Sequence, residues 1–463
     1  MKKIEKIIEY LIYLLVFLLP WQTRLILKQG MINGAVWEYG TYSLYLLDFL
    51  FAIIFILAFF YWLFRKKDNW KMHNKKVSDI LGVVILLLLI SFASIFWAEQ
   101  HNLAIYYFLR LGQGIVLALI IYLISVDFKK IALALISASF IQSLLALWQF
   151  FSQKVVGSSL LGMANQLPQD AGVSVVEASF GRFLRAYGSL PHPNILAGFL
   201  VVSLIIILGL LIMSSTYRER YFLWLVAVVD FAALFFTFSK SAFLALALAY
   251  LFIFVFLYLT RDYGSKVTFY HLAMVGILVT AILGFIYSDL VFVRLNATER
   301  LEQQSVTDRI TYLHQAQQIL VNNWDKGVGI GNYTVADYNL SYRKFPGYEY
   351  QPVHNVYILI LAELGVGGLL IFFLLIGAII RVILNYRLEY NFELMEVFKE
   401  YKQQEMVEDY GFATYWFLVF TAILVAILTM FFFDHYFWTL YSGIVFFWLV
   451  LGLWLKQVRL NRI

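Results

Sequence analysis

The sequence predicts an all-α polytopic membrane protein with about twelve transmembrane helices. Its 463 residues are 62% hydrophobic and only 14% charged, whereas a soluble domain is about half apolar and a quarter charged. A spanning helix needs about 20 predominantly apolar residues, and twelve runs of roughly that length follow one another along the chain. These observations indicate a protein that is solvated mainly by lipid.

The twelve runs are expected to form one helix each. The first run follows basic residues, but no small-residue cleavage site comes after it, so we interpret it as a retained helix and not as a signal peptide. The expected spans are residues 6–26, 42–64, 79–97, 103–125, 131–152, 194–215, 221–238, 242–260, 268–288, 354–380, 412–432 and 437–455.

The distribution of basic residues predicts the orientation. With the amino terminus in the cytoplasm, 22 of the 35 Lys and Arg residues fall in cytoplasmic segments and 12 in outer segments. Because cytoplasmic loops carry an excess of Lys and Arg, both termini are expected inside. Two outer connections, 153–193 and 289–353, are far longer than ordinary turns, and such segments are commonly functional. We expect a division into 1–193, with five helices and the first of these loops, and 194–463, with the remaining helices and the second.

The second outer loop is expected to contain a short amphipathic helix at the membrane surface. In SVTDRITYLHQAQQILVNN, Ser305 and Thr307 are candidate N-caps. Gly327 is a candidate stop signal after the helix. The residues expected to share one apolar face are Ile310, Leu313 and Leu320.

Two residues of this loop are candidates for chemistry. Arg309 is expected in the first turn of the helix, where the macrodipole disfavours a cation. Its presence there indicates either a functional role or a solvated surface pair with Asp308. His354 opens the next span, and an imidazole there can accept a proton near neutral pH. Its position alone favours an interfacial histidine, with Asn355 capping the helix.

Further basic residues lie at the outer ends of other spans. Lys240 lies in a short hairpin, where it either snorkels or meets an anion. Arg185 presents a planar fork that suits phosphate oxygens. His192 is interpreted as structural, with Asn194 as a candidate cap of the helix that follows.

Four ionisable residues stand out well inside the expected spans. Asp48 and Arg110 lie at similar depths, which predicts an intramembrane ion pair. Asp230 and Glu363 have no obvious partner in the sequence. Because ionisable groups inside a membrane are expensive, each is a candidate for a specific role.

Several classes of function are excluded by what the sequence lacks. No cysteine and no Asp-x-Asp occur, so thiolate metal sites and the usual metal-bound sugar-nucleotide site lack ligands. No phosphate-binding nucleotide loop occurs, and no basic stripe interleaved with aromatics indicates nucleic-acid binding. What remains is a set of basic residues in the outer segments, with His354 expected at the same side of the membrane. Such a group of cations suits the binding of a diphosphate carried on a lipid.

Four stretches in order carry a family resemblance. They are RAYGSLPHPNILAGFL, TFSKSAF, DRITYLHQAQQILVNNWDKGVGIGNY and HNVYILILAELGVGGLLIF. Together they resemble the bacterial O-antigen ligase / O-antigen polymerase family over about residues 180–380. The resemblance implies a GT-C-like membrane glycosyltransferase of cell-envelope biosynthesis. Such an enzyme takes a glycan from an undecaprenyl-diphosphate carrier and passes it to an acceptor at the outer face of the cytoplasmic membrane.

The resemblance also implies roles for individual residues. It makes His354 the candidate base and Arg309 a catalytic contact to the diphosphate. Arg185 matches an Arg-x-x-Gly stretch of the family and is a second diphosphate contact. Lys240 stands where the family carries arginine in a Ser-Arg motif, so it keeps the charge and loses the bidentate geometry.

The resemblance implies no metal and no cofactor. The expected partners are a lipid-linked glycan donor, the bilayer, and a glycolipid, glycan or protein acceptor, with no nucleic acid. Ligase and polymerase remain open alternatives, and the rival of another class is a flippase for the same lipid-linked glycan.

Overall fold

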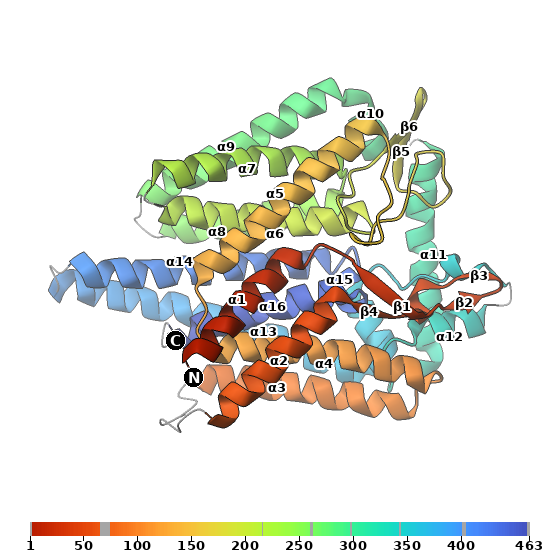
Figure 1. Cartoon of the computed structure of the whole chain (residues 1–463), viewed down its shortest axis with the longest axis horizontal. Coiled ribbons are helices and arrows are strands. Elements are labelled where there is room, and N and C mark those ends of the chain that lie inside the picture. Colours follow the sequence, from red (N-terminus) through yellow and green to blue (C-terminus); the bar gives the residue numbers. More distant parts are fainter. Residues whose placement is uncertain are drawn as a thin grey trace.

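The computed structural model describes residues 2–64, 75–214, 216–259, 263–296, 299–341, 344–400 and 404–460. Long helices lie side by side in one bundle, with both termini at one end (Figure 1). The helices that coincide with the twelve expected runs are α1 (Lys2–Leu18), α2 (Leu46–Phe64), α3 (Lys75–Ala93), α4 (His101–Leu123), α5 (Phe128–Ser152), α6 (Pro193–Met213), α7 (Tyr217–Phe236), α8 (Lys240–Leu259), α9 (Tyr263–Ile286), α13 (Val356–Glu400), α14 (Gln404–Met430) and α16 (Tyr441–Leu460).

The bundle confirms a polytopic membrane protein. Within the described residues, nine helices are long and apolar enough to cross a bilayer: α2 to α6, α8, α9, α13 and α16. The other three fall short for identifiable reasons. Helix α1 has 17 residues, α7 carries four charged residues, and the apolar stretch in the described part of α14 is Tyr415–Met430. The count of twelve crossings therefore stays a prediction.

Two helices form the centre of the bundle. About nine tenths of the residues in the apolar stretches of α6 and α16 are buried, whereas most residues in the apolar stretch of α9 are not buried. A helix that is apolar all round belongs inside a bundle, and α6 packs against α5, α7 and α14 while α16 packs against α4 and α14. The apolar core includes residues from both sides of position 193, and the division of the chain at that position stays a prediction.

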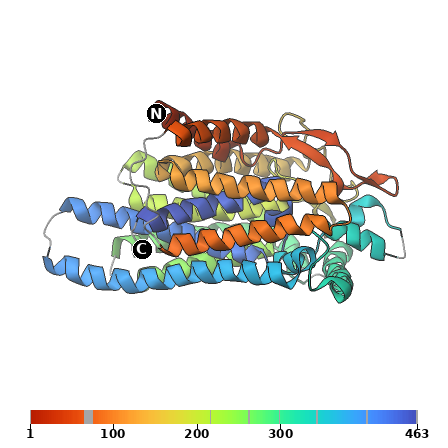
Figure 2. The same ribbon diagram turned by 90° about the horizontal axis from the view of Figure 1, so that it is seen from below.

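Short elements cover the end of the bundle opposite the termini (Figure 2). The sequence did not predict the strands there, because segments of two to five residues give no recognisable alternation. The antiparallel pairs are β1 (Arg24–Lys28) with β4 (Tyr42–Tyr45), β2 (Met31–Ile32) with β3 (Ala35–Val36), and β5 (Val175–Ala178) with β6 (Gly181–Leu184). The expected first span was too long, since α1 ends before Pro20 and the chain then enters β1.

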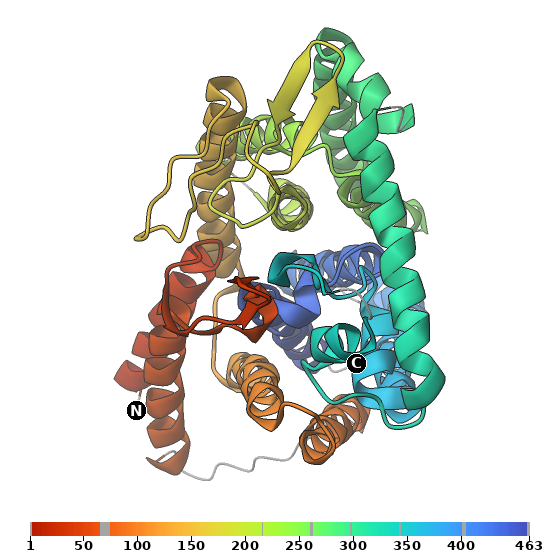
Figure 3. The same cartoon turned by 90° about the vertical axis from the view of Figure 1, so that its right-hand side faces the viewer.

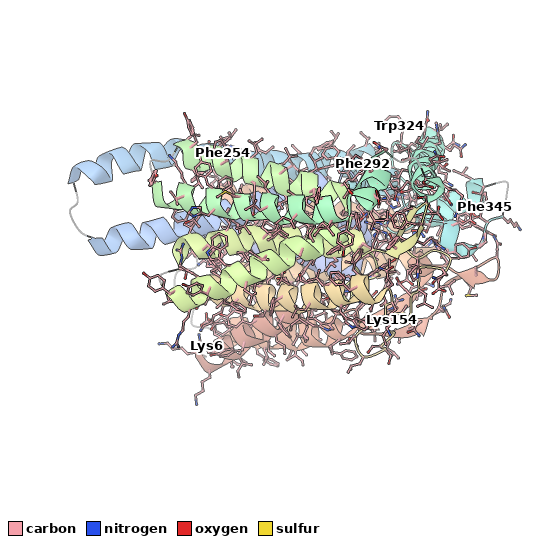
Figure 4. The ribbon with its side chains drawn as sticks, turned by 90° about the horizontal axis from the view of Figure 1, so that it is seen from above. Lys6, Lys154, Phe254, Phe292, Trp324 and Phe345 are labelled. Atoms are coloured by element: carbon pink, nitrogen blue, oxygen red, sulfur yellow. The ribbon has the colours of Figure 1, made fainter. Side chains whose placement is uncertain are left out.

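Three short helices and one long one complete this end. They are α10 (Ser288–Asn296), α11 (Arg300–Asn323), α12 (Tyr333–Leu340) and α15 (Tyr436–Thr439), with a turn of 3-10 helix between β3 and β4. Helix α11 runs across the ends of the spanning helices along one edge of the molecule (Figure 3). In Figure 4, Lys6 lies at the end of the termini, whereas Trp324 and Phe345 lie at the opposite end.

The chain after α11 inserts into a break in α13. Gly365 has φ +69°, which interrupts the helix. The amides of Val328 and Gly329 donate to the carbonyls of residues 362 and 363, and the amide of Val366 donates to the carbonyl of Trp324, each at 2.9 Å. A Cβ on Gly365 would lie 2.3 Å from a backbone oxygen of the inserted chain, so only glycine fits this position.

The four ionisable residues that were singled out within the spans have partners in the described structure. Asp48 and Arg110 form the predicted ion pair. Asp230 and Glu363, for which the sequence offered no obvious partner, are both hydrogen-bonded. Asp230 accepts hydrogen bonds from three serine hydroxyls of α5 and α6, and Glu363 accepts one from the indole of Trp438 at 2.9 Å. These partners come from distant segments, so local sequence carries no sign of them.

Candidate functional site

An imidazole–carboxylate cluster lies at the start of α13. It consists of His354, just before α13, and of Asp434 and His435, between α14 and α15. One nitrogen or oxygen atom of each residue lies within 4.8 Å of those of the other two. The rings of His354 and His435 meet edge to face with centroids 5.0 Å apart, and the ring of Tyr312 stacks on His354 at 5.3 Å.

The start of α13 is tied to the end of α14, and this contact assembles the cluster. Asn355 caps α13 as predicted, because its side-chain oxygen accepts from the amide of Ile358 at 3.0 Å. The amide of Val356 donates to the carbonyl of Phe431 at 2.8 Å. His354 is therefore held beside the residues that follow Phe431.

Asp434 is the only carboxylate of this cluster. Its oxygens accept from the side-chain amide of Asn194 at 3.2 Å and from the amide of His435 at 2.8 Å. Burial opposes ionisation, but the surrounding histidines, His354 first among them, hold the pKa of Asp434 below its usual range. An ionised carboxylate beside an imidazole orients the ring and stabilises its protonated form.

The imidazoles of the cluster are neutral. Burial lowers the pKa of His354, and the nearby charge of Arg309 lowers it further, against the opposing charge of Asp434. Burial also lowers the pKa of His435 to about 3. A neutral imidazole has a free lone pair with which it can accept a proton.

Four cations lie at the same end of the bundle as the cluster, and they include the three that the sequence singled out. Arg309 on α11 and Lys240 at the first residue of α8 are both exposed. Arg309 is an electrostatic neighbour of His354, Lys240 and Arg185. The structure therefore brings the predicted site residues to one end of the bundle. The roles of these residues in binding or catalysis stay predictions.

Arg294 is the fourth cation, and sequence reasoning missed it. It lies on α10, forms an ion pair with Glu302 of α11, and donates from Nε to the carbonyl of Phe238 at 3.1 Å. Phe238 lies in the turn that precedes Lys240, so Arg294 holds this turn against α10 and α11. Nothing in the local sequence distinguishes it from other loop arginines.

Arg185 is held by the protein on three sides. The side chain is only 4% exposed. It donates to the carbonyl of Thr237 at 2.6 Å, to the hydroxyl of Ser174 at 2.8 Å and to the side-chain oxygen of Asn194 at 2.8 Å. Burial, and then the charge of Arg294, lower its pKa to about 9. Through Asn194, Arg185 is connected to Asp434.

His192, and not Asn194 as expected, caps α6. His192 is the N-cap of α6, and its Nδ1 accepts from the amide of Asn194 at 3.1 Å. Asn194 instead links Arg185 to Asp434, as described above. Burial, followed by the charge of Arg185, lowers the pKa of His192 to about 3, which agrees with its structural interpretation.

The predicted start of the outer-loop helix was wrong. Helix α11 begins at Arg300, with Glu299 as an N-cap that makes no side-chain hydrogen bond. Ser305 and Thr307 are therefore inside the helix and are not its caps. Arg309 consequently lies in the third turn, where the macrodipole argument no longer applies.

The apolar face that was expected is only in part the face that packs on the bundle. Ile310 is 51% exposed and Leu313 46% exposed, Leu320 is half-buried, and Ala316 and Ile319 are buried. Helix α11 packs on α13 and on β5, and this docking places Ala316 and Ile319 inside. The correct face depends on neighbours that are distant in sequence.

The fold and the site together define a polytopic membrane protein with an ionisable site at one end of its bundle. The model of the family described as O-antigen ligase matches residues 222–373. This match confirms the resemblance to the O-antigen ligase family, a family of membrane ligases and polymerases of lipid-linked glycans. The segment includes Lys240, Arg309 and His354, whereas Arg185 and Asp434 lie outside it. No curated protein matches the chain.

Proposed function

We propose that the protein transfers an oligo- or polysaccharide from an undecaprenyl-diphosphate carrier to an acceptor hydroxyl, as an O-antigen ligase does. In this proposal it is a GT-C-like enzyme of the bacterial cytoplasmic membrane, with both termini inside and the site outside. One observation supports it above all: His354 lies beside Asp434, and the exposed Arg309 of α11 is an electrostatic neighbour both of His354 and of Lys240 on α8.

The chemistry follows from these two groups. The acceptor hydroxyl gives its proton to His354 while its oxygen bonds to the anomeric carbon of the donor. The bond from that carbon to the diphosphate breaks, and the lipid diphosphate leaves with the electron pair. Attack opposite the leaving group inverts the anomeric centre. General-base catalysis contributes typically about 10²–10⁴-fold, and cations placed at the developing charge contribute further.

Each cation has a proposed part. Arg309 is exposed and, unlike Arg185, has a guanidinium that can meet a diphosphate in a bidentate manner. Lys240 supplies a point charge beside it. The N–H groups of Arg185 are already hydrogen-bonded to Thr237, Ser174 and Asn194. Arg185 therefore acts through its positive charge and by fixing the side chain of Asn194. No metal and no cofactor takes part in this scheme.

The test uses the purified protein with lipid-linked donor and acceptor, and product mass as the readout. His354→Ala should abolish transfer in a protein that remains folded and inserted, whereas His314→Gln, which alters an exposed histidine of α11, should not. Wild-type turnover by His354→Ala would remove this residue as the base.

Donor binding tests the cations separately. Arg309→Ala should lose binding of the carrier-linked glycan, and Arg300→Ala on the same helix is the matched control, because that side chain is 70% exposed. Unchanged binding by Arg309→Ala would contradict the assigned role. Product mass also separates a ligase from a polymerase, and movement of donor across vesicles without a new glycosidic bond would identify a flippase.

A further inference from the structure

We propose that His354, Asp434 and His435 form a binding site for a divalent transition metal of the zinc type, and that the bound ion inhibits the protein. The binding of a metal does not depend on the proposed function. Only the inhibition rests on the proposed glycan transfer.

The ligand set suits zinc. Imidazole nitrogens and carboxylate oxygens are common zinc ligands, and sites with three protein ligands leave a fourth position for water. Three ligand atoms at bond lengths of about 2.0–2.2 Å from one tetrahedral ion lie about 3.3–3.6 Å apart. The three atoms here lie within 4.8 Å of one another, so side-chain rotations that draw them together by about 1 Å bring them to one ion.

The groups around the ligands resemble the outer shell of a metal site. Nδ1 of His435 is hydrogen-bonded to the hydroxyl of Thr439 at 2.8 Å, which leaves Nε2 as the ligand atom. The Asp434 carboxylate is fixed by Asn194 and by the amide of His435. Such outer partners orient ligands and raise metal affinity.

An unpartnered nitrogen gives independent support for a ligand at this position. Nδ1 of His354 is buried and has no hydrogen-bond partner among the described residues, although the carbonyl of Pro352 lies close to the ring. A buried polar atom without a partner carries a desolvation cost, and a metal ion would satisfy it. The neutral imidazoles and the ionised carboxylate are also in the protonation states that metal binding requires.

Inhibition follows from shared use of one residue. A metal ion on His354 occupies a lone pair of the imidazole and adds positive charge beside it. The ring then cannot accept a proton from an acceptor hydroxyl. Zinc and the acceptor therefore compete for the same group.

The first experiment measures zinc binding by the full-length protein, without donor or acceptor, through competition with a chromophoric chelator. We expect one zinc ion per chain. Losing an outer partner costs about 10–100-fold in affinity, so His435→Gln, which removes a ligand, should lose at least about 100-fold. His314→Gln should bind as the wild type does. Absence of binding, or equal binding by His435→Gln, would overturn the proposal.

Two further measurements do not depend on the folding of a variant. Cobalt added to the wild-type protein should give the visible absorption bands of a four-coordinate ion with nitrogen and oxygen ligands, and their absence would overturn the site. Zinc should suppress glycan transfer and a chelator should restore it. If zinc binds while transfer continues, the inhibition is refuted. If no transfer occurs in metal-free buffer, the proposed function fails and the binding result stands.

Discussion

Replacement of Arg185 by lysine tests whether this residue holds the outer end of the bundle together. The guanidinium donates to three acceptors, on the first outer loop, on α6 and on the turn between α7 and α8. A hydrogen bond to a charged group contributes about 1.5–3 kcal/mol. Lysine keeps the charge but cannot reach all three acceptors, so at least one bond is lost. We expect a loss of stability of about 1.5–3 kcal/mol for each lost bond.

The assay is the midpoint of thermal unfolding in one detergent, with Arg309→Lys as the matched control. Arg309 is exposed and has no ion pair among the described residues, so its replacement should change stability by less than about 0.5 kcal/mol. The reasoning is refuted if Arg185→Lys unfolds at the wild-type temperature. In that case Arg185 would act on the donor alone.

Three further predictions concern buried groups. Asp48→Ala should destabilise the protein by about 3–5 kcal/mol, because it leaves the charge of Arg110 buried and unpaired, and adding Arg110→Met should recover part of the unfolding midpoint. Gly365→Ala should lower the midpoint by the equivalent of about 1–3 kcal/mol through backbone strain, while Gly377→Ala, in open space, should not. Burial raises the pKa of Asp337 to about 7. The folded protein therefore binds this proton more tightly than the unfolded chain, and stability should fall as the pH rises from about 4 to 7. Asp337→Asn should flatten that dependence, and an unchanged slope would contradict it.

The spanning helices could be predicted because hydropathy accumulates over about 20 residues. Each expected run coincides with a helix, and the ion pair of Asp48 with Arg110 followed from their equal depth. The boundaries that failed lie in the outer loops. There α11 begins five residues before Ser305, since its first turns are fixed by the contact of Glu302 with Arg294 and not by a cap.

The site could be predicted only in part. Lys240, Arg309 and His354 were found because each lies in a recognisable stretch at the outer end of a span. Asp434 and His435 were missed, although an aspartate and a histidine between two apolar runs were a usable signal. Their importance arises from packing, because α13 and α14 must be side by side before the cluster exists.

The break in α13 has a mechanical consequence. The chain that follows Arg309 and the helix that follows His354 share main-chain hydrogen bonds around Gly365. Neither segment can slide along the membrane normal unless the other moves with it. A displacement of the segment after α11 would therefore be passed directly to α13 through these hydrogen bonds.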